Sequence, residues 1–379
     1  MSLKFNDLFN HLLSQHSVSS TNSLIDQSNI GVINLLADTF SRLGFSCEIV
    51  PVAGAHEKAN LIATIGRGPG GLVLSGHTDT VPFDESLWNT NPLGMTEKDN
   101  RLYGLGATDM KGFFAVVHEA VQDFLDADFR QPLIILATAD EESSMSGART
   151  LANLGKPKAR AAVIGEPTSL RPIHMHKGIM MESIHVQGQS GHSSNPTLGK
   201  NALEAMHDVI GALMRFRQEL QLEYQNPHFI IDVPTINLGV IHGGDNPNRI
   251  CGHCDLEFDV RLLPGMAGDA VRESIEALIA PIASKHHTDI KLTRLIEGVE
   301  PFDNRDTELV KMAELLTGHS PESAAFGTEG PFLQQLGMDT IILGPGCIDQ
   351  AHQPDEYMEL SQVKPCINIL QQLIRNYCL

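Results

Sequence analysis

Five side chains of this sequence are nitrogen or oxygen donors that stand next to short apolar runs or, in one case, just ahead of an amphipathic segment. They are His77, Asp109, Glu142, Glu166 and His352. Donors of this kind suit Zn²⁺, Co²⁺ or Mn²⁺. No thiolate belongs to the set, which argues against a closed structural zinc site. The sequence therefore predicts metal-assisted chemistry.

Charge counting favours two divalent cations over one. Two such cations carry four positive charges, and the carboxylates of Asp109, Glu142 and Glu166 cancel three of them, which leaves one for a hydroxide ion. One carboxylate must be shared between two metals about 3.5–4 Å apart. We expect Asp109 to be the shared ligand.

Two further carboxylates beside the ligands have predicted roles. Asp79 stands two residues after His77, which suits a group that holds the imidazole in one tautomer. Glu141 stands next to Glu142 and is not needed as a ligand. A spare carboxylate beside an activated water is what a hydrolase needs as its general base.

Each of these residues also has a simpler interpretation. An acidic residue after a strand is commonly a helix N-cap, and Glu141 and Glu142 could begin a helix. His352 alone would be an ordinary loop histidine. The whole set at the ends of successive strands makes this interpretation improbable. Cys251 and Cys254 form a C-x-x-C pair without a second half, and the alternating pattern from Cys254 onward favours a structural strand.

The apolar runs are the elements that must position these side chains. Short apolar runs bounded by Gly or Pro indicate buried strands of a parallel sheet, and ligands bind outside the carboxyl ends of such strands. From residue 26 to about 178 these runs alternate with helical patterns, as in βαβ units. The turn-rich segment 66–71 is predicted to form a hairpin.

The rhythm of the sequence changes near residue 178 and returns near 306. In between, the patterns predict strands at 181–187, 235–240, 253–262 and 288–295, and helices at 201–222 and 267–280. Two strand-helix-strand units of this kind form a two-layer α+β sandwich. We therefore expect an α/β domain formed by residues 1–178 and 294–379, interrupted by an inserted α+β domain at 179–293.

Length and charge limit the class of protein. A chain of 379 residues is longer than one hydrophobic core usually supports, which favours two domains. A formal charge of −19 argues against nucleic acid and anionic membranes as partners. The apolar runs are far shorter than the roughly 18 residues of a membrane span, and the N-terminus lacks the pattern of a signal peptide. A cytoplasmic protein is expected.

Several segments resemble a known family. The segments Ser75–Pro82, Gly106–Gly112, Thr138–Glu142 and Ile164–Thr168 are similar to the block motifs of the di-zinc aminoacylase and carboxypeptidase family, which also includes desuccinylases. Further segments, at 188–194, 242–245, 248–251 and 344–357, resemble the branch that removes the acetyl group from N-acetylornithine. The resemblance covers nearly the whole chain, and all five ligand positions and the base are filled.

The resemblance has implications for fold, cofactor and activity. It implies a zinc-peptidase-like catalytic domain with a mixed, mainly parallel sheet flanked by helices, and an inserted lid domain through which the chain forms a homodimer. It implies two divalent metal ions, Zn²⁺ above Co²⁺, and release of acetate and L-ornithine from N2-acetyl-L-ornithine in arginine biosynthesis. The alternatives are hydrolysis of another N-acyl amino acid and a non-catalytic binding relative, which would be expected to lack a ligand or the base.

The resemblance also implies roles for the metal ligands. It gives His77 and Glu166 to one metal, Glu142 and His352 to the other, and Asp109 to both.

Residues outside the ligand set are implied to contact the substrate. His192, in the lid, is similar to a histidine that reaches the partner subunit's active site and stabilises the oxyanion; its alternative is a surface histidine. Arg249 with Asn248 is the candidate for the substrate α-carboxylate, because guanidinium offers a planar fork. Glu329 is the candidate for the substrate ammonium. A surface salt bridge is the alternative for Arg249 and for Glu329.

Overall fold

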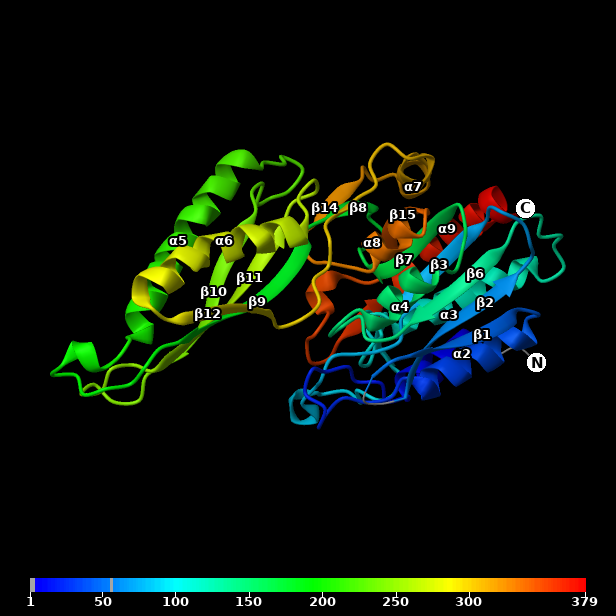
Figure 1. Ribbon diagram of the computed structural model, residues 1–379. Helices are drawn as coiled ribbons and strands as arrows, with labels where there is room; N and C mark the ends of the chain where they lie inside the picture. Colours follow the sequence, from blue (N-terminus) through cyan, green and yellow to red (C-terminus); the bar gives the residue numbers. More distant parts are fainter. Residues whose placement is uncertain (1–3, 55–56) are drawn as a thin grey trace. The chain divides into compact units, whose positions relative to one another are not determined.

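The computed structural model describes residues 4–54 and 57–379, which form two compact units. The first comprises residues up to His174, Asn304–Glu322 and Glu329–Leu379, and the second comprises Met175–Asp303 and Ser323–Thr328. Figure 1 shows both, the second mainly in green and yellow. The sequence placed the boundaries of the insertion at 178/179 and 293/294. No helix among the described residues is long and apolar enough to cross a membrane.

A mixed sheet forms the centre of the first unit. Its order is β1-β2-β6-β3-β7-β15-β8, in which β6, β3, β7 and β15 run parallel and the outer pairings are antiparallel. The strands are β1 (Ser46–Val52), β2 (Lys58–Ile65), β3 (Leu72–His77), β6 (Leu133–Thr138), β7 (Ala161–Pro167), β8 (Ile173–His176) and β15 (Asp339–Gly344). The predicted mainly parallel α/β class is confirmed by this arrangement.

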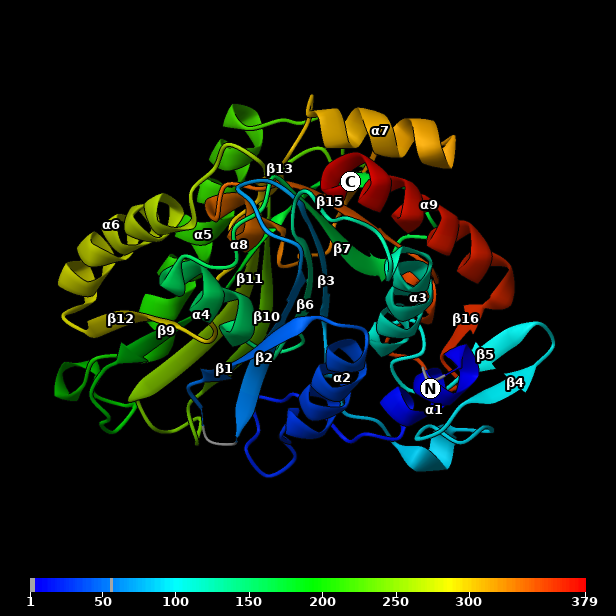
Figure 2. The same cartoon turned by 90° about the vertical axis from the view of Figure 1, so that its right-hand side faces the viewer.

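Helices cover both faces of this sheet. In Figure 2, α2, α3, α7 and α9 lie on one side and α4 and α8 on the other. The helices of the unit are α1 (Phe5–Leu13), α2 (Ile30–Arg42), α3 (Lys111–Val121), α4 (Ser146–Leu154), α7 (Glu308–Thr317), α8 (Gly330–Gln335) and α9 (Leu360–Cys378). Because both faces are covered, β3, β6 and β7 are buried along their whole length. This burial explains why they are continuous apolar runs in the sequence.

A small antiparallel sheet joins distant parts of the chain beside the main sheet. Its order is β16-β5-β4, and its strands are β4 (Thr96–Lys98), β5 (Arg101–Tyr103) and β16 (Tyr357–Glu359). The pairing of β5 with β16 sets the segment just after His352 beside the segment just before Asp109.

The second unit is a two-layer sandwich. Its sheet has the order β10-β11-β9-β12, and α5 and α6 pack side by side on one face (Figure 1). The elements are β9 (Gly178–Gln187), α5 (Ala202–Glu223), β10 (Thr235–Gly243), β11 (His253–Leu262), α6 (Gly268–His286) and β12 (Asp289–Arg294). Asn201 caps α5 by accepting a hydrogen bond from the amide of Leu203. Alternate residues of β11 are buried, because helices cover only one face.

Short strands lie where the chain passes between the units. β13 (Phe302–Asp303) pairs with Met175 and His176 at the end of β8, and β14 (Glu322–Ala324) also pairs with β8.

Candidate metal centre

The carboxyl ends of neighbouring strands bring the five predicted ligands together. β3 lies between β6 and β7, and all three run parallel. His77 is the last residue of β3, Glu166 is next to last in β7, and Glu142 follows β6 in the loop before α4. Asp109 lies just before α3, and His352 lies in the connection from β15 to β16. The strand order thus converts positions far apart in the sequence into one cluster.

Asp109 lies between two histidines. Its Oδ1 is 3.0 Å from Nε2 of His77, and its Oδ2 is 3.3 Å from Nε2 of His352. Glu166 Oε1 is 3.8 Å from Nε2 of His77, and Glu142 Oε2 is 3.1 Å from Nε2 of His352. Each carboxylate oxygen of Asp109 therefore faces one histidine–glutamate pair, as a carboxylate shared by two metals must do.

Asp79 contacts both His77 and the loop after β6. Nδ1 of His77 is 3.0 Å from the backbone oxygen of Asp79 and 3.8 Å from its carboxylate. With a proton on Nδ1, Nε2 of the neutral imidazole is left to bind a metal. The Asp79 carboxylate accepts hydrogen bonds from the amides of Glu141 and Glu142, at 3.3 and 3.0 Å. Asp79 is therefore placed to orient the imidazole through its main chain and to hold this loop through its side chain.

The candidate base Glu141 lies at the same cluster. A carboxylate oxygen of Glu141, a ring nitrogen of His77 and a carboxylate oxygen of Glu166 lie within 4.8 Å of one another. Burial and the charge of Glu166 raise the pKa of Glu141 well above its usual value. Burial and the charges of Asp109 and Glu142 raise the pKa of Glu166 in the same way. So many buried carboxyl groups remain ionised together only with compensating positive charge.

Glu329 adds a further acidic group. Its side chain is 1% exposed, and its Oε1 has no hydrogen-bond partner among the described residues. Burial raises the pKa of Glu329 to about 7. The orphaned oxygen, the N and O donor set and the mutual repulsion of the carboxylates all fit a centre that holds two divalent cations.

Two glycines allow α3 to approach the ligand-bearing strand ends. A Cβ atom at Gly76 would lie 2.5 Å from Cε of Met110, and one at Gly165 would lie 2.3 Å from the ring of Phe113. A side chain at Gly165 would clash with a ring of α3, whereas one at Gly76 would have to displace the flexible end of Met110. The close packing keeps Asp109, just ahead of α3, beside the ends of β3 and β7.

A buried ion pair supports the loop that carries Glu141 and Glu142, and the sequence analysis gave it no role. Asp140 accepts hydrogen bonds from the hydroxyls of Ser19 and Ser146, at 2.8 Å each, and pairs with Lys58. Lys58 also binds Asp26 at 2.6 Å. The only sign of this role in the sequence is that Asp140 directly precedes Glu141.

His192 lies in the second unit and is exposed. Its Nδ1 is 2.7 Å from the hydroxyl of Ser194 and accepts a hydrogen bond from the Ser194 amide at 3.2 Å. An accepting Nδ1 places the proton of the neutral imidazole on Nε2. His192 can therefore donate a hydrogen bond from Nε2.

Arg249 and Asn248 are also exposed and lie beside His192 along a short antiparallel bridge. Arg249 Nη1 is 2.5 Å from Oδ2 of Asp245. An exposed pair of this kind contributes at most about 1 kcal/mol. A substrate carboxylate can therefore compete for the guanidinium at little cost.

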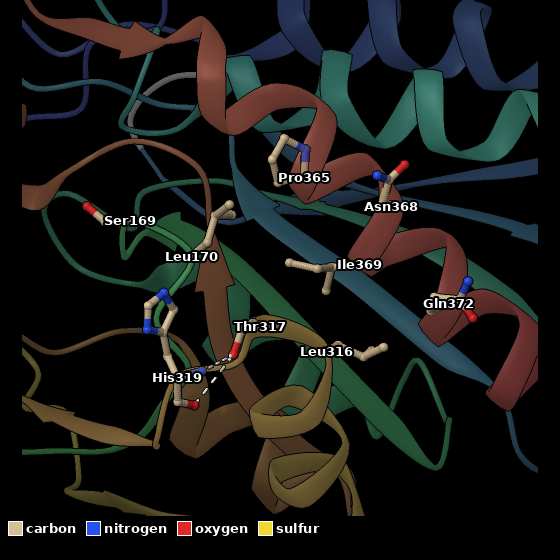
Figure 3. A pocket seen from close by; sticks show the side chains of 9 residues that line it. All are labelled: Ser169, Leu170, Leu316, Thr317, His319, Pro365, Asn368, Ile369 and Gln372. Carbon is tan, nitrogen blue, oxygen red and sulfur yellow. Dashed lines mark hydrogen bonds between the residues drawn. The ribbon is translucent and has the colours of Figure 1, made fainter.

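A separate hollow of about 410 Å³ in the first unit offers no comparable chemistry. Figure 3 shows its lining residues, which come from the segment after β7, the end of α7 and α9: Ser169, Leu170, Leu316, Thr317, His319, Pro365, Asn368, Ile369 and Gln372. None of these nine is a carboxylate. The candidate metal ligands therefore lie at the strand ends and not in this hollow.

Comparison with known proteins decides the family. The model of peptidase family M20/M25/M40 matches residues 73–376. The chain belongs to the M20 peptidase family. This M20 protein is 46% identical over 376 residues to acetylornithine deacetylase of Photorhabdus laumondii, with 99% of the chain and 97% of that relative covered. It is 45% identical over 375 residues to acetylornithine deacetylase of Klebsiella pneumoniae, with 99% and 98% covered.

The fold of this M20 chain matches solved structures of the family. A Bacillus subtilis protein named as a dinuclear metal binding peptidase from the M20 family superposes with a TM-score of 0.69 at 14% sequence identity, over 98% of this chain and 96% of that one. The predicted family membership is thus confirmed by both sequence and fold.

Proposed function

We propose that the chain is a metal-dependent amide hydrolase that converts N2-acetyl-L-ornithine and water into L-ornithine and acetate. The observation that carries the reaction class is the position of Asp109, whose two carboxylate oxygens each face a different histidine. The substrate is proposed from the full-length similarity to acetylornithine deacetylases.

The metal ligands divide into two sets around Asp109. His77 and Glu166 would bind one divalent cation, His352 and Glu142 the other, and Asp109 both. Imidazole and carboxylate ligands favour Zn²⁺, with Co²⁺ as a functional substitute. When bound, such a pair of cations makes water more acidic and polarises the amide carbonyl of the substrate.

Glu141 moves the proton in this proposal. Its carboxylate accepts a proton from the attacking water as the new C–O bond forms. It then gives this proton to the α-nitrogen as the C–N bond breaks, so that the leaving group departs as an amine. The hydrogen bonds from the Glu141 and Glu142 amides to Asp79 hold the base in position throughout.

Three groups outside the ligand set are proposed to contact the substrate. His192 donates a hydrogen bond from Nε2 to the oxyanion, in the active site of its own or of the partner subunit. Arg249, with Asn248, binds the α-carboxylate as a fork. Glu329 faces the side-chain ammonium of ornithine, because its buried oxygen has no partner among the described residues.

The chain is also proposed to form a homodimer through the inserted unit. β10 is an edge strand that pairs with β11 on one side, and Val240 and Ile241 on it are 41% and 49% exposed. Apolar side chains on an exposed edge strand suit pairing with a second chain.

Acetate release by the metal-free protein tests the proposal. The chain is stripped of metal, incubated with N2-acetyl-L-ornithine, and assayed before and after addition of Zn²⁺ or Co²⁺. Metal-dependent release of acetate is expected, and no release with either metal would refute metal-dependent deacetylation of N2-acetyl-L-ornithine.

A panel of acyl amino acids tests the substrate separately. The N-succinyl and N-formyl derivatives of ornithine, N-acetylmethionine and a dipeptide are compared with N2-acetyl-L-ornithine by kcat/KM. N2-acetyl-L-ornithine is expected to have the highest value. A higher value for another member would keep the reaction class and replace the substrate.

A further inference from the structure

We propose that Glu356 is a positioning residue for the metal centre, which holds the Asp109 loop in the geometry that both metals need. The inference rests on the proposed role of Asp109 as the ligand that the two metals share. Glu356 is not one of the predicted ligands, and both of its carboxyl oxygens accept hydrogen bonds from backbone amides.

Three hydrogen bonds to its side chain and one to its main chain connect Glu356 to this loop. Its Oε1 accepts from the amides of Thr108 and Asp109, at 2.8 and 2.9 Å, and its Oε2 accepts from the amide of Gly106 at 3.1 Å. Its backbone oxygen accepts from the amide of Gly104 at 3.0 Å. One residue thus fixes four points of the segment that ends at Asp109.

The contact between Glu356 and the Asp109 loop is buried. Glu356 is 1% exposed and Thr108 is 1% exposed, while Gly106 has a φ of +80° that a side chain would strain. Amide groups in such a place must be paired, since an unpaired buried amide costs about 1–3 kcal/mol. Among the residues that the structure describes, the amides of Thr108 and Asp109 donate to Glu356 alone, so the loop conformation depends on this carboxylate.

The same segment carries a ligand of the second metal. His352 precedes Glu356 by four residues, and it approaches Oδ2 of Asp109 to 3.3 Å. Between them, Asp355 accepts hydrogen bonds from the amides of Asn89 and Thr90, at 2.9 and 2.8 Å. Glu356 therefore links the segment of His352 to the segment of Asp109, and sets the distance between two of the ligands as well as the orientation of one.

Loss of this link is expected to act through metal binding and not through substrate binding. A glutamine at position 356 has only one oxygen that can accept hydrogen bonds. Its side-chain NH₂ would face a backbone N–H, and two donors cannot form a hydrogen bond with each other. At least one of the three amide bonds is lost, and Asp109 is free to turn away from its two histidines. Groups that orient metal ligands in this way typically contribute 10–100-fold to metal affinity.

The experiment compares Glu356→Gln with Glu359→Gln. Glu359 is the last residue of β16 (Tyr357–Glu359), the strand that directly follows Glu356. Its side chain is 32% exposed and pairs with Arg101 at 2.9 Å, and it accepts none of the hydrogen bonds that the Asp109 loop donates to Glu356. Zn²⁺ is titrated calorimetrically into each metal-free protein, and kcat and KM for N2-acetyl-L-ornithine are measured after loading. Urea unfolding of each metal-free protein reports the effect on folding alone.

Glu356→Gln is expected to weaken Zn²⁺ binding 10–100-fold and to lower kcat at limiting metal, with KM within about twofold of the wild type. Glu359→Gln is expected to match the wild type in Zn²⁺ affinity, kcat and KM. Wild-type Zn²⁺ affinity in folded Glu356→Gln would overturn the inference, since a merely structural role lowers stability without changing that affinity.

A second variant keeps the inference testable if Glu356→Gln does not fold. Glu356→Asp retains the carboxyl group and withdraws it by one methylene, so that a similar loss of Zn²⁺ affinity is expected, and unchanged affinity would overturn the inference. The proposed function fails in a different way. If the wild type binds no Zn²⁺ and releases no acetate, the function is wrong, whereas a fully active wild type matched by Glu356→Gln refutes the role of Glu356 alone.

Discussion

The two units present their polar residues in opposite ways. In the first unit two of the predicted ligands, His77 and Glu166, lie in strands that are buried along their whole length, and His77 is 1% exposed, whereas His352 lies in an exposed connection. In the second unit one face of β11 is open, and the candidate substrate residues His192 and Arg249 lie on exposed segments. Buried side chains have many fixed contacts, and exposed side chains have few.

This difference separates two kinds of functional residue. A buried ligand is held by the packing and hydrogen bonds around it, so its substitution changes metal binding, stability or both. An exposed side chain makes few contacts in the folded chain, so its substitution is expected to change the reaction kinetics without changing stability. The second unit can therefore supply contacts to the substrate without any cost to its own stability, whereas the first unit must compensate the repulsion of its carboxylates.

The largest expected effect tests whether neighbouring carboxylates of the first unit have different roles. Glu141→Gln is expected to lower kcat by about 10²–10⁴-fold, because the base is lost, while two Zn²⁺ ions remain bound. Glu142→Gln removes a ligand and is expected to lower the Zn²⁺ content itself. The measurements are acetate release at saturating substrate and metal content after dialysis. Equal loss of Zn²⁺ from both variants would show that Glu141 is a ligand and not the base.

A buried ion pair of the first unit is expected to stabilise the fold more than an exposed one of the second. The Lys58 side chain is 6% exposed and pairs with Asp140 and Asp26. Lys58→Met leaves two buried carboxylates without their cation, which is expected to lower the free energy of unfolding by about 3–5 kcal/mol.

The matched control for Lys58 is Lys285, whose side chain is 67% exposed and pairs with Asp208 at 2.7 Å. Lys285→Met is expected to change the free energy of unfolding by less than about 1 kcal/mol. Urea unfolding of the metal-free proteins measures both. If the two variants lose equal stability, burial does not separate the ion pairs of the two units.

The exposed histidine of the second unit is expected to affect only the reaction rate. His192→Ala is expected to lower kcat by about 10²–10³-fold, through loss of one oxyanion donor, with Zn²⁺ content and urea unfolding unchanged. His185, exposed on β9 and bonded to Asp255 at 2.7 Å, provides the control, and His185→Ala is expected to keep kcat within about twofold. A normal kcat for His192→Ala would leave this histidine as a surface residue.

Local sequence patterns predicted the fold best where a pattern has one structural meaning. Continuous apolar runs gave the strands that end at His77 and Glu166, because a strand covered on both faces has no polar positions. Strand order has no such local sign. The prediction of a hairpin at 66–71 is wrong, since β2 and β3 both pair with β6 and not with each other. The helix predicted at 267–280 is longer than expected, since α6 passes through Pro281 and ends at His286.

Positioning residues were harder to predict than ligands for a physical reason. Asp140 and Glu356 act on partners that are far away in the sequence, and Glu356 binds backbone N–H groups, which every residue type except proline carries. A carboxylate that accepts hydrogen bonds from amides leaves no pattern at the amide positions. Only the folded arrangement shows that such a residue is needed.

The smallest expected effect concerns a buried titratable group of the second unit, away from the predicted ligands. His176 is fully buried, its Nδ1 donates to the Lys177 carbonyl at 2.9 Å, and its Nε2 accepts from the Thr328 amide at 3.3 Å. Burial lowers the pKa of His176 to about 4. The folded chain therefore keeps this histidine neutral, while the unfolded chain, with a pKa near 6.5, takes up a proton as the pH falls.

Stability from this neutral histidine is fully present above pH 6.5 and is lost as the pH falls from there toward 4. About 2 kcal/mol of the free energy of unfolding is expected to be lost between pH 6.5 and pH 5. His176→Gln can form both hydrogen bonds without titrating, so its loss over this interval is expected to be smaller by that amount. Urea unfolding of the metal-free wild type and variant at the two pH values measures the loss of unfolding free energy in each protein. The contributions of the other titrating groups are the same in both proteins and cancel in the comparison. Equal losses in the two proteins would mean that His176 takes up its proton in the folded chain as readily as in the unfolded one.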